Sequence, residues 1–114
     1  MPTIIYKIAT RAQWNDAEAK GVFSGAPIDL EDGYIHFSTR EQVMETAEKH
    51  FHGQKDLRLI SVDADTLGEA LVWEPSRGGA LFPHLYSELA VSDTLAVQEL
   101  GDRTDGGHDF PELF

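Results

Sequence analysis

The sequence predicts one α+β domain, with short strands in split mixed or antiparallel sheets and two main helices. Runs of β-branched and aromatic residues of strand length recur along the chain. Two capping-box patterns each precede a helical stretch. The chain has 114 residues, of which 41% are hydrophobic and 25% are charged, and these shares suit a single folded domain. We expect that domain to occupy residues 1–100 and an acidic tail to follow at residues 101–114.

The first third of the chain predicts a strand, a helix and a short turn. Residues 3–9 are β-branched and aromatic, as in an opening strand. Thr10 and Gln13 form a capping box that begins a helix, and Gly21 ends it. Residues 27–30 then predict a turn or a single helical turn.

The next strand, at residues 34–38, alternates in polarity. Alternate side chains of a strand point to opposite faces. Ile35 and Phe37 are expected to face the core. The remaining side chains then share the other face: Tyr34, His36 and Ser38.

The middle of the chain predicts a second helix and a buried strand. Thr39 and Gln42 form the second capping box, which predicts a helix over residues 40–51. Residues 57–62 are apolar and β-branched, as in a central strand. Residues 63–67 predict a turn or a short helix.

The last third predicts extended segments joined by loops. Residues 72–74 form a short strand that Pro75 ends. Residues 76–79 carry no packing signal and are expected to form a mobile loop. Residues 82–86 are extended, and residues 94–100 form the final strand.

The charge of the chain narrows the classes of partner. There are 20 acidic and 9 basic residues, for a formal net charge of −11. Nucleic-acid affinity depends on basic side chains that neutralise phosphates, and anionic membrane surfaces attract basic segments. We therefore expect neither nucleic acid nor membrane as a partner. A small-molecule ligand remains compatible, because charges are screened within about 8–10 Å.

Other compositional features exclude several chemistries. The chain contains no cysteine, so it has no disulfide, thiol nucleophile or cysteine-based zinc site. No run approaches the roughly 20 apolar residues that span a bilayer, and the N-terminus lacks a signal-peptide layout. A cytoplasmic location is expected. His-Glu-x-x-His spacing is absent, and no metal is expected.

The corner between strand 34–38 and the following helix is the first candidate ligand site. His36 and Ser38 are expected to point towards a helix start at Thr39 and Arg40, where unpaired N–H groups and a partial positive charge favour an anion. An imidazole and a hydroxyl at such a place suit a ribose phosphate. The alternative interpretation is structural: His36 bonds to a backbone carbonyl and Ser38 only marks the helix entry.

The segment at residues 82–86 is the second candidate. Its alternation places Phe82, His84 and Tyr86 on one face, and aromatic rings beside a histidine suit a planar ligand. The alternative is a core edge in which the rings pack and His84 caps a turn.

Glu74 and Arg77 extend this second candidate. Glu74 follows Trp73, and a carboxylate against an indole is expected to have a raised pKa and to act as a base or charge stabiliser. Arg77 lies in a glycine loop that would close over an anionic ligand. The alternative for both is a solvated surface side chain.

Two motifs carry a family resemblance: Gly-Tyr-Ile-His-Phe-Ser-Thr at residues 33–39 and Phe-Pro-His-Leu-Tyr at residues 82–86. With further matches over roughly residues 3–100, the chain resembles the bacterial family called domain of unknown function 952. That family has no assigned reaction. Its small domains are similar in fold to the ADP-ribosyltransferase group, which binds NAD between two short, split β-sheets. The resemblance therefore implies an ADP-ribosyltransferase-like fold.

The RNA 2′-phosphotransferase branch of that group is similar in two places. Its His-x-Ser strand is matched by His36 and Ser38, and its helix ending in Arg-His-Gly is matched by His52 and Gly53. Phe51 stands where the arginine is expected, and a phenylalanine cannot hold phosphate. This departure argues against RNA 2′-phosphotransfer.

The primary hypothesis is a domain that binds NAD or a related nucleotide. The resemblance gives His36 the ribose-contacting role of the strand histidine, and it makes Glu74 or Glu88 the candidate for the late glutamate. If there is an ADP-ribosyl or glycosyl transfer, Glu74 and His84 are the predicted catalytic groups. The predicted ligand contacts are Tyr34, His36, Ser38, Thr39, Trp73, Arg77, Phe82 and Tyr86. The alternative hypothesis is a non-catalytic ligand-sensing or protein-interaction module that kept the fold without the reaction.

Overall fold

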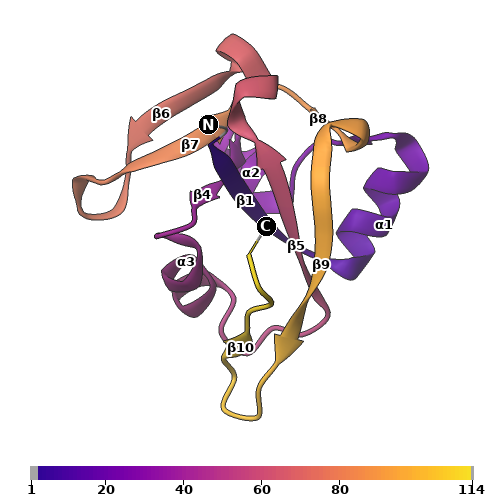
Figure 1. Ribbon diagram of the computed structural model, residues 1–114, viewed down its shortest axis with the longest axis vertical. Coiled ribbons are helices and arrows are strands. Elements are labelled where there is room, and N and C mark those ends of the chain that lie inside the picture. Colours follow the sequence, from indigo (N-terminus) through magenta and orange to yellow (C-terminus); the bar gives the residue numbers. More distant parts are fainter. Residues whose placement is uncertain (1–2, 114) are drawn as a thin grey trace.

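The computed structural model describes residues 3–113, apart from the side chain of Arg77. Its strands pair antiparallel in three sheets (Figure 1), so the α+β class is confirmed. The large sheet contains, in spatial order, β10 (His108–Asp109), β9 (Thr94–Asp102), β5 (Leu57–Asp63), β1 (Ile4–Thr10) and β4 (Ser38–Thr39). The second sheet contains β3 (Ile35–His36), β7 (Leu81–Leu85) and β6 (Leu71–Pro75), and the third pairs β2 (Val22–Phe23) with β8 (Leu89–Ala90).

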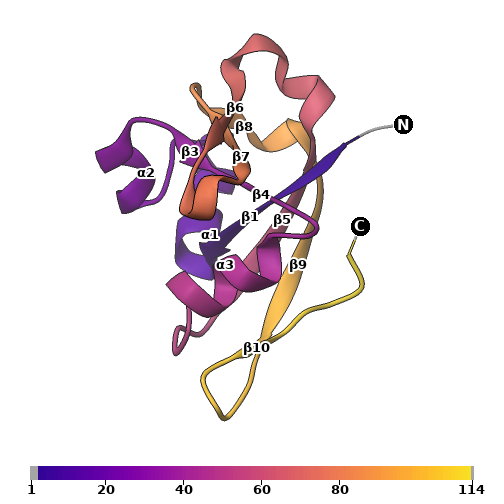
Figure 2. The same ribbon diagram turned by 90° about the vertical axis from the view of Figure 1, so that its left-hand side faces the viewer.

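Three α-helices and three 3₁₀ turns complete the described part of the chain. They are α1 (Arg11–Lys20), α2 (Pro27–Asp32), α3 (Val43–His50), η1 (Ala64–Ala70), η2 (Arg77–Gly79) and η3 (Val91–Asp93). The sheet of β3, β7 and β6 lies on the far side of β1 from β9, together with α2 (Figure 2).

The first capping box is confirmed. Thr10 Oγ1 accepts from the Gln13 amide and Gln13 Oε1 accepts from the Thr10 amide, both at 3.0 Å. Gly21 ends α1 with a left-handed φ of 85°, a conformation that glycine adopts without steric cost.

Two clusters of buried side chains cover the two faces of the large sheet. Ile5 and Ala9 of β1 belong to the cluster that includes Trp14 of α1. Tyr6 and Ile8 belong to the other cluster, on which α3 packs. This alternation is the period of two that a strand imposes on its side chains.

The predicted strand at residues 34–38 is two short strands in different sheets, and this corrects the prediction. β3 pairs with β7, whereas β4 pairs with β1. The chain crosses between the sheets at Phe37, whose side chain is buried and whose amide donates to the Pro83 carbonyl at 3.0 Å. Because β4 pairs with only Ile5 and Tyr6, the rest of that edge of β1 has no neighbouring strand among residues 3–113.

The second helix begins three residues later than predicted. Residues 40–42 form a turn, in which the Gln42 amide donates to the Thr39 carbonyl at 3.1 Å. The Gln42 side chain accepts from the Thr39 amide and donates to the Leu81 carbonyl. Since Thr39 is extended and paired with β1, it does not act as the helix cap, and α3 starts at Val43.

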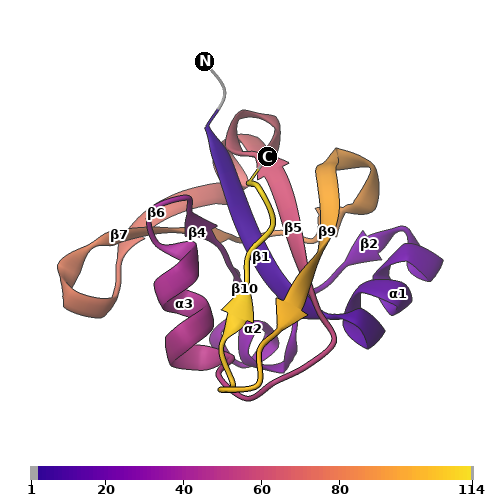
Figure 3. The same cartoon turned by 60° about the horizontal axis from the view of Figure 1, so that its bottom comes forward.

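The predicted acidic tail continues the large sheet. β9 extends to Asp102, and β10 pairs His108 with Asp102. Phe110 and Leu113 then pack against the cluster beneath α3 (Figure 3). Residues 94–100 are thus part of a strand that is not the last one.

Candidate functional site

A cavity of about 560 Å³ lies at the uncovered edge of β1. β1, α2, the β3–β7 pair and α3 line it. Its volume is within the range of about 300–1,000 Å³ that ligand pockets occupy. The second sheet therefore forms one wall of a space large enough for a small molecule.

Two histidines face each other on that wall. His36 and His84 are paired residues of β3 and β7, and their ring centroids are 5.6 Å apart. Tyr34 stacks on His84, with ring centroids 4.1 Å apart and planes 24° from parallel. All three residues line the cavity. The structure thus brings the two sequence motifs together.

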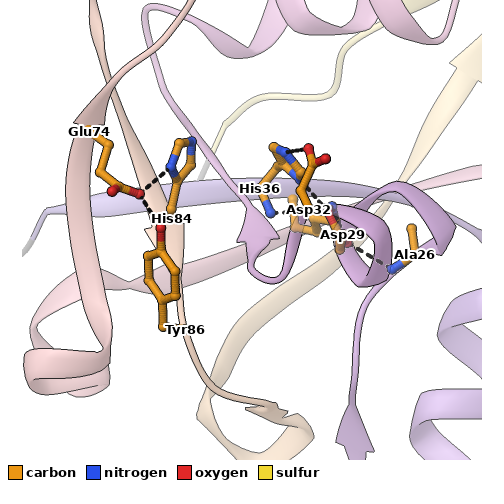
Figure 4. A network of polar contacts seen from close by, with 8 residues as sticks. Ala26, Asp29, Asp32, His36, Glu74, His84 and Tyr86 are labelled. Atoms are coloured by element: carbon orange, nitrogen blue, oxygen red, sulfur yellow. Dashed lines mark hydrogen bonds and ion pairs between the residues drawn. The ribbon is translucent and has the colours of Figure 1, made fainter.

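His36 is held between two carboxylates (Figure 4). Its Nδ1 lies 2.6 Å from Asp29 Oδ1 and its Nε2 lies 2.9 Å from Asp32 Oδ2. The contact with Asp29 is a hydrogen bond, whereas the contact with Asp32 is a close approach of a carboxylate oxygen to the second ring nitrogen. The predicted ribose contact through a His36 nitrogen would therefore have to displace Asp32, whose side chain is 38% exposed.

Asp29 is the buried centre of this network. Its side chain has no exposed surface, and it lies 2.7 Å from Lys7 Nζ, which is itself buried. Asp29 also accepts from the amides of Ala26 at 2.7 Å and His36 at 3.1 Å. Burial opposes its ionised form, but the bonds from His36, Lys7 and Ala26 outweigh burial and lower the pKa of Asp29 to about 2. Burial also lowers the pKa of Lys7, and the neighbouring Asp29 only partly opposes this.

Local sequence explains why Asp29 takes this position. Pro27 occupies the first turn of α2, and Asp29, two residues later, reaches back to the Ala26 amide as an N-terminal capping group does. Gly25 has a φ of 126°, and a Cβ added there would lie 2.9 Å from Asp29 Cβ. A glycine is therefore needed beside the buried carboxylate.

Glu74 holds the second histidine. Its Oε1 lies 2.8 Å from His84 Nδ1 and accepts from the Tyr86 hydroxyl at 2.7 Å (Figure 4). These two bonds lower the pKa of Glu74, so the raised pKa predicted from an indole neighbour is wrong. The bond to Glu74 raises the pKa of Tyr86 to about 12. Burial, Asp32 and Glu74 raise the pKa of Tyr34.

Ser38 and Phe82 also border the cavity, as predicted for ligand contacts. Ser38 is buried, and its Oγ lies 2.9 Å from Thr46 Oγ1 of α3. Phe82 and His84 are buried in β7, on the same face of the strand. Glu74 and Tyr86 do not line the cavity themselves; they contact it through His84 and Tyr34.

Two predicted contacts lie elsewhere. Trp73 alternates with Glu74 on β6 and borders a shallow hollow beside Ala64 and Gly68, because adjacent strand residues face opposite ways. Thr39 is taken up in the turn before α3. The prediction for Arg77 falls on a side chain outside the described part of the structure.

The expected anion site at a helix start is also corrected. α3 borders the cavity with Thr46 at its middle, with His50 at its end, and with Phe51 just beyond it. The partial positive charge of a helix lies at its N-terminus. The dipole of α3 therefore does not favour a phosphate in this cavity.

Sequence reasoning missed Lys7, Asp29 and Asp32. Lys7 gave a signal, because a charged residue inside an otherwise apolar opening strand requires a buried partner. Asp29 gave a weaker one, as an acidic residue in the first turn after Pro27. No local pattern linked either residue to His36. Within residues 3–113, no group of three or more His, Asp or Glu side chains is placed to hold a metal ion.

This geometry defines a class: a small α+β domain with a cavity whose wall carries two carboxylate-bound histidines. The chain belongs to the family described as a protein of unknown function, DUF952, whose model matches residues 8–97. The resemblance inferred from the two motifs is thus confirmed at the level of the family.

Solved structures agree with this assignment. The crystal structure of protein CC0527 from Caulobacter crescentus is 51% identical, with a TM-score of 0.91 and 94% of each chain covered. The solution NMR structure of CC0527 is 52% identical, with a TM-score of 0.82, and the match covers 91% of this chain and 90% of that one. Among curated proteins none matches significantly. No helix in the described residues has both the length and the apolar character to cross a membrane.

Proposed function

We propose that this chain binds NAD or a related nucleotide in the 560 Å³ cavity beside the paired histidines. The observation that carries the proposal is the stacked pair of Tyr34 and His84 on the cavity wall, with Phe82 next to it. Flat aromatic and imidazole faces are the surfaces on which planar rings of nucleotides stack. We infer that the ring of the ligand packs against this wall.

The finer fold assignment supports the same ligand class. An ADP-ribosyltransferase-like domain holds NAD between two split sheets, and here two sheets diverge where the chain crosses at Phe37. The cavity lies beside that crossing, between β1 of one sheet and the β3–β7 pair of the other. A cytoplasmic location is part of this proposal.

Calorimetry with the wild-type chain and a matched pair of variants tests the proposal. Tyr34→Leu removes the stacking face and is expected to weaken NAD binding roughly tenfold, in line with the loss of one stacked ring. Trp73→Ala removes an aromatic ring from the opposite face of the second sheet and leaves binding unchanged. Absence of heat with wild type at millimolar NAD, or equal losses in both variants, contradicts the proposal.

A second candidate function is cleavage of the glycosidic bond to nicotinamide, which the contact between Glu74 and His84 favours. Nδ1 faces the carboxylate and carries the hydrogen, so Nε2 of the neutral ring can accept a proton from an attacking water. The water oxygen bonds to C1′ as the bond between C1′ and the pyridinium nitrogen breaks, so nicotinamide leaves with the electron pair and the ribose keeps the new hydroxyl. Glu74 is then a positioning residue, because it touches His84 and not the cavity.

Nicotinamide release distinguishes this enzyme from a non-catalytic module. Release that disappears in His84→Ala, and whose pH profile changes in Glu74→Gln, supports the enzyme. Binding without release supports the module, which the structure favours at one point: Phe51, in place of a phosphate-holding arginine, packs against the cluster beneath α3.

A further inference from the structure

The hydrogen-bond directions on the cavity wall restrict what can bind there. The Thr46 hydroxyl donates to the Gln42 carbonyl at 3.1 Å, so in its contact with Ser38 it accepts. The Ser38 hydroxyl therefore donates its hydrogen to Thr46, and towards a ligand it can act only as an acceptor. A ligand group beside Ser38 has to be a donor.

His84 and Asp32 are also acceptors towards a ligand. Nδ1 of His84 faces Glu74, which only accepts, so this bond selects the tautomer whose Nε2 is an acceptor. Asp32 Oδ2 lies 2.9 Å from His36 Nε2, and the second oxygen of this carboxylate remains an acceptor. These hydrogen positions follow from the partners of each group. Three polar groups that line the cavity are thus hydrogen-bond acceptors, so a ligand that bonds to them has to supply the donors.

The charged side chains at the cavity also restrict which ligand groups can bind there. Lys7 contacts both oxygens of Asp29, so its ammonium is neutralised within the wall. Even with His36 counted as positive, Lys7 and His36 contact two carboxylates, Asp32 in the lining and Asp29 behind it, and a third, Glu74, lies behind His84. The rim also carries His50, exposed at the end of α3, which at most balances the third carboxylate. The described wall therefore offers no excess positive charge to a pyrophosphate.

The aromatic rings add an attraction for cations. The face of an aromatic ring is negative and binds cationic groups, most strongly where water is excluded. Tyr34 presents such a ring near the carboxylate of Asp32, and burial and then Asp32 raise the pKa of its phenol. The nicotinamide ring of NAD is an N-alkyl pyridinium, which is planar and positively charged, and its carboxamide supplies hydrogen-bond donors.

We propose that this cavity selects a planar cationic ring that donates hydrogen bonds, so that the nicotinamide end of NAD enters it and the pyrophosphate stays outside. This inference rests on the proposed function and names the part of the ligand that is recognised. It assigns Ser38, His84 and Asp32 as the acceptors for that ring.

Calorimetric titration of the wild-type chain with three probes tests the inference. NAD and N1-methylnicotinamide, which carry the pyridinium, are expected to bind, and N1-methylnicotinamide is expected to compete with NAD. ADP-ribose, which keeps the pyrophosphate and lacks the ring, is expected to bind at least about tenfold more weakly than NAD, as expected for loss of one cation–π contact and its hydrogen bonds. ADP-ribose that binds as tightly as NAD overturns the inference and leaves the proposed function standing.

A pair of charge-matched variants locates the effect. Asp32→Asn is expected to weaken N1-methylnicotinamide binding several-fold, whereas Asp16→Asn, on an exposed pair of α1, changes the net charge equally and leaves binding unchanged. Equal effects of the two variants overturn the inference. If none of the three probes binds to wild type, the proposed function fails together with the inference.

Discussion

His36 and His84 lie directly opposite each other on β3 and β7, and each binds a carboxylate through Nδ1. They are 48 positions apart in the sequence (84 minus 36) yet share one wall of one cavity. Each carboxylate partner comes from a different element, Asp29 from α2 and Glu74 from β6. The pairing of β3 with β7 in the second sheet therefore assembles the site. The stability of the site depends on the carboxylates that bind the two histidines.

Removal of Asp29 is expected to cost more stability than removal of its partner. Asp29→Ala leaves the Lys7 ammonium and two amides without their acceptor, and breaking a buried pair typically costs about 3–5 kcal/mol. Lys7→Met leaves Asp29 with its bonds from Ala26 and His36 and is expected to cost less. Urea unfolding measures both. Asp16→Ala, from an exposed helix pair, is expected to cost less than about 1 kcal/mol. A loss for Lys7→Met equal to that for Asp29→Ala argues against this account of the network.

Low pH is expected to lower the free energy of unfolding by protonating Asp29. The pKa of Asp29 falls from 3.8 to about 2 on folding, so the ionised group stabilises the native state above its unfolded pKa. That contribution is lost as the pH falls from about 4 towards about 2. The free energy of unfolding, measured across this window, should decline more steeply for wild type than for Asp29→Asn. Parallel curves would show that Asp29 is not stabilised in its ionised form.

Tyr86 reports on Glu74. The ionised carboxylate accepts the phenol hydrogen and raises the pKa of Tyr86 to about 12. Glu74→Gln removes the charge, so the pKa of Tyr86 should fall towards its ordinary value of 10.0. Ultraviolet absorbance titration measures phenol ionisation, and Tyr86→Phe identifies which transition belongs to this residue. An unchanged transition in Glu74→Gln would refute the hydrogen bond.

Gly25 and Gly21 form a matched pair for the backbone beside the site. Both have a positive φ, which an L side chain rarely adopts, but a Cβ on Gly21 meets nothing within 4 Å. A Cβ on Gly25 would lie 2.9 Å from Asp29 Cβ. Gly25→Ala should therefore lower the melting temperature more than Gly21→Ala. If the two variants melt together, the close approach to Asp29 is not important for stability.

Local patterns predicted some elements well and others poorly. The capping box at Thr10 and Gln13 depends only on neighbouring residues, and it was confirmed. The strand at residues 34–38 followed its alternation correctly, but the crossing at Phe37 depends on which strands are available for pairing on each side. A periodicity argument contains no information about those partners.

In the candidate site, too, local patterns predicted some features and missed those that depend on the tertiary fold. His36 and His84 carry visible chemistry in recognisable motifs, and the structure brings both to one cavity, while their role in ligand binding stays a prediction. Trp73 was misplaced because its neighbour Glu74 faces the other way on β6. The bonds from Asp29 to Lys7 and His36 span 22 and 7 positions, so only the tertiary fold reveals them.

Histidine NMR during titration with NAD tests the central claim most directly. Of the five histidines, His36, His50 and His84 line the cavity, whereas His52 and His108 border a separate hollow between α3 and β10. The account predicts that NAD shifts the imidazole signals of His36 and His84 and leaves those of His52 and His108 in place. Shifts confined to His52 and His108, or none at saturating ligand, would contradict it.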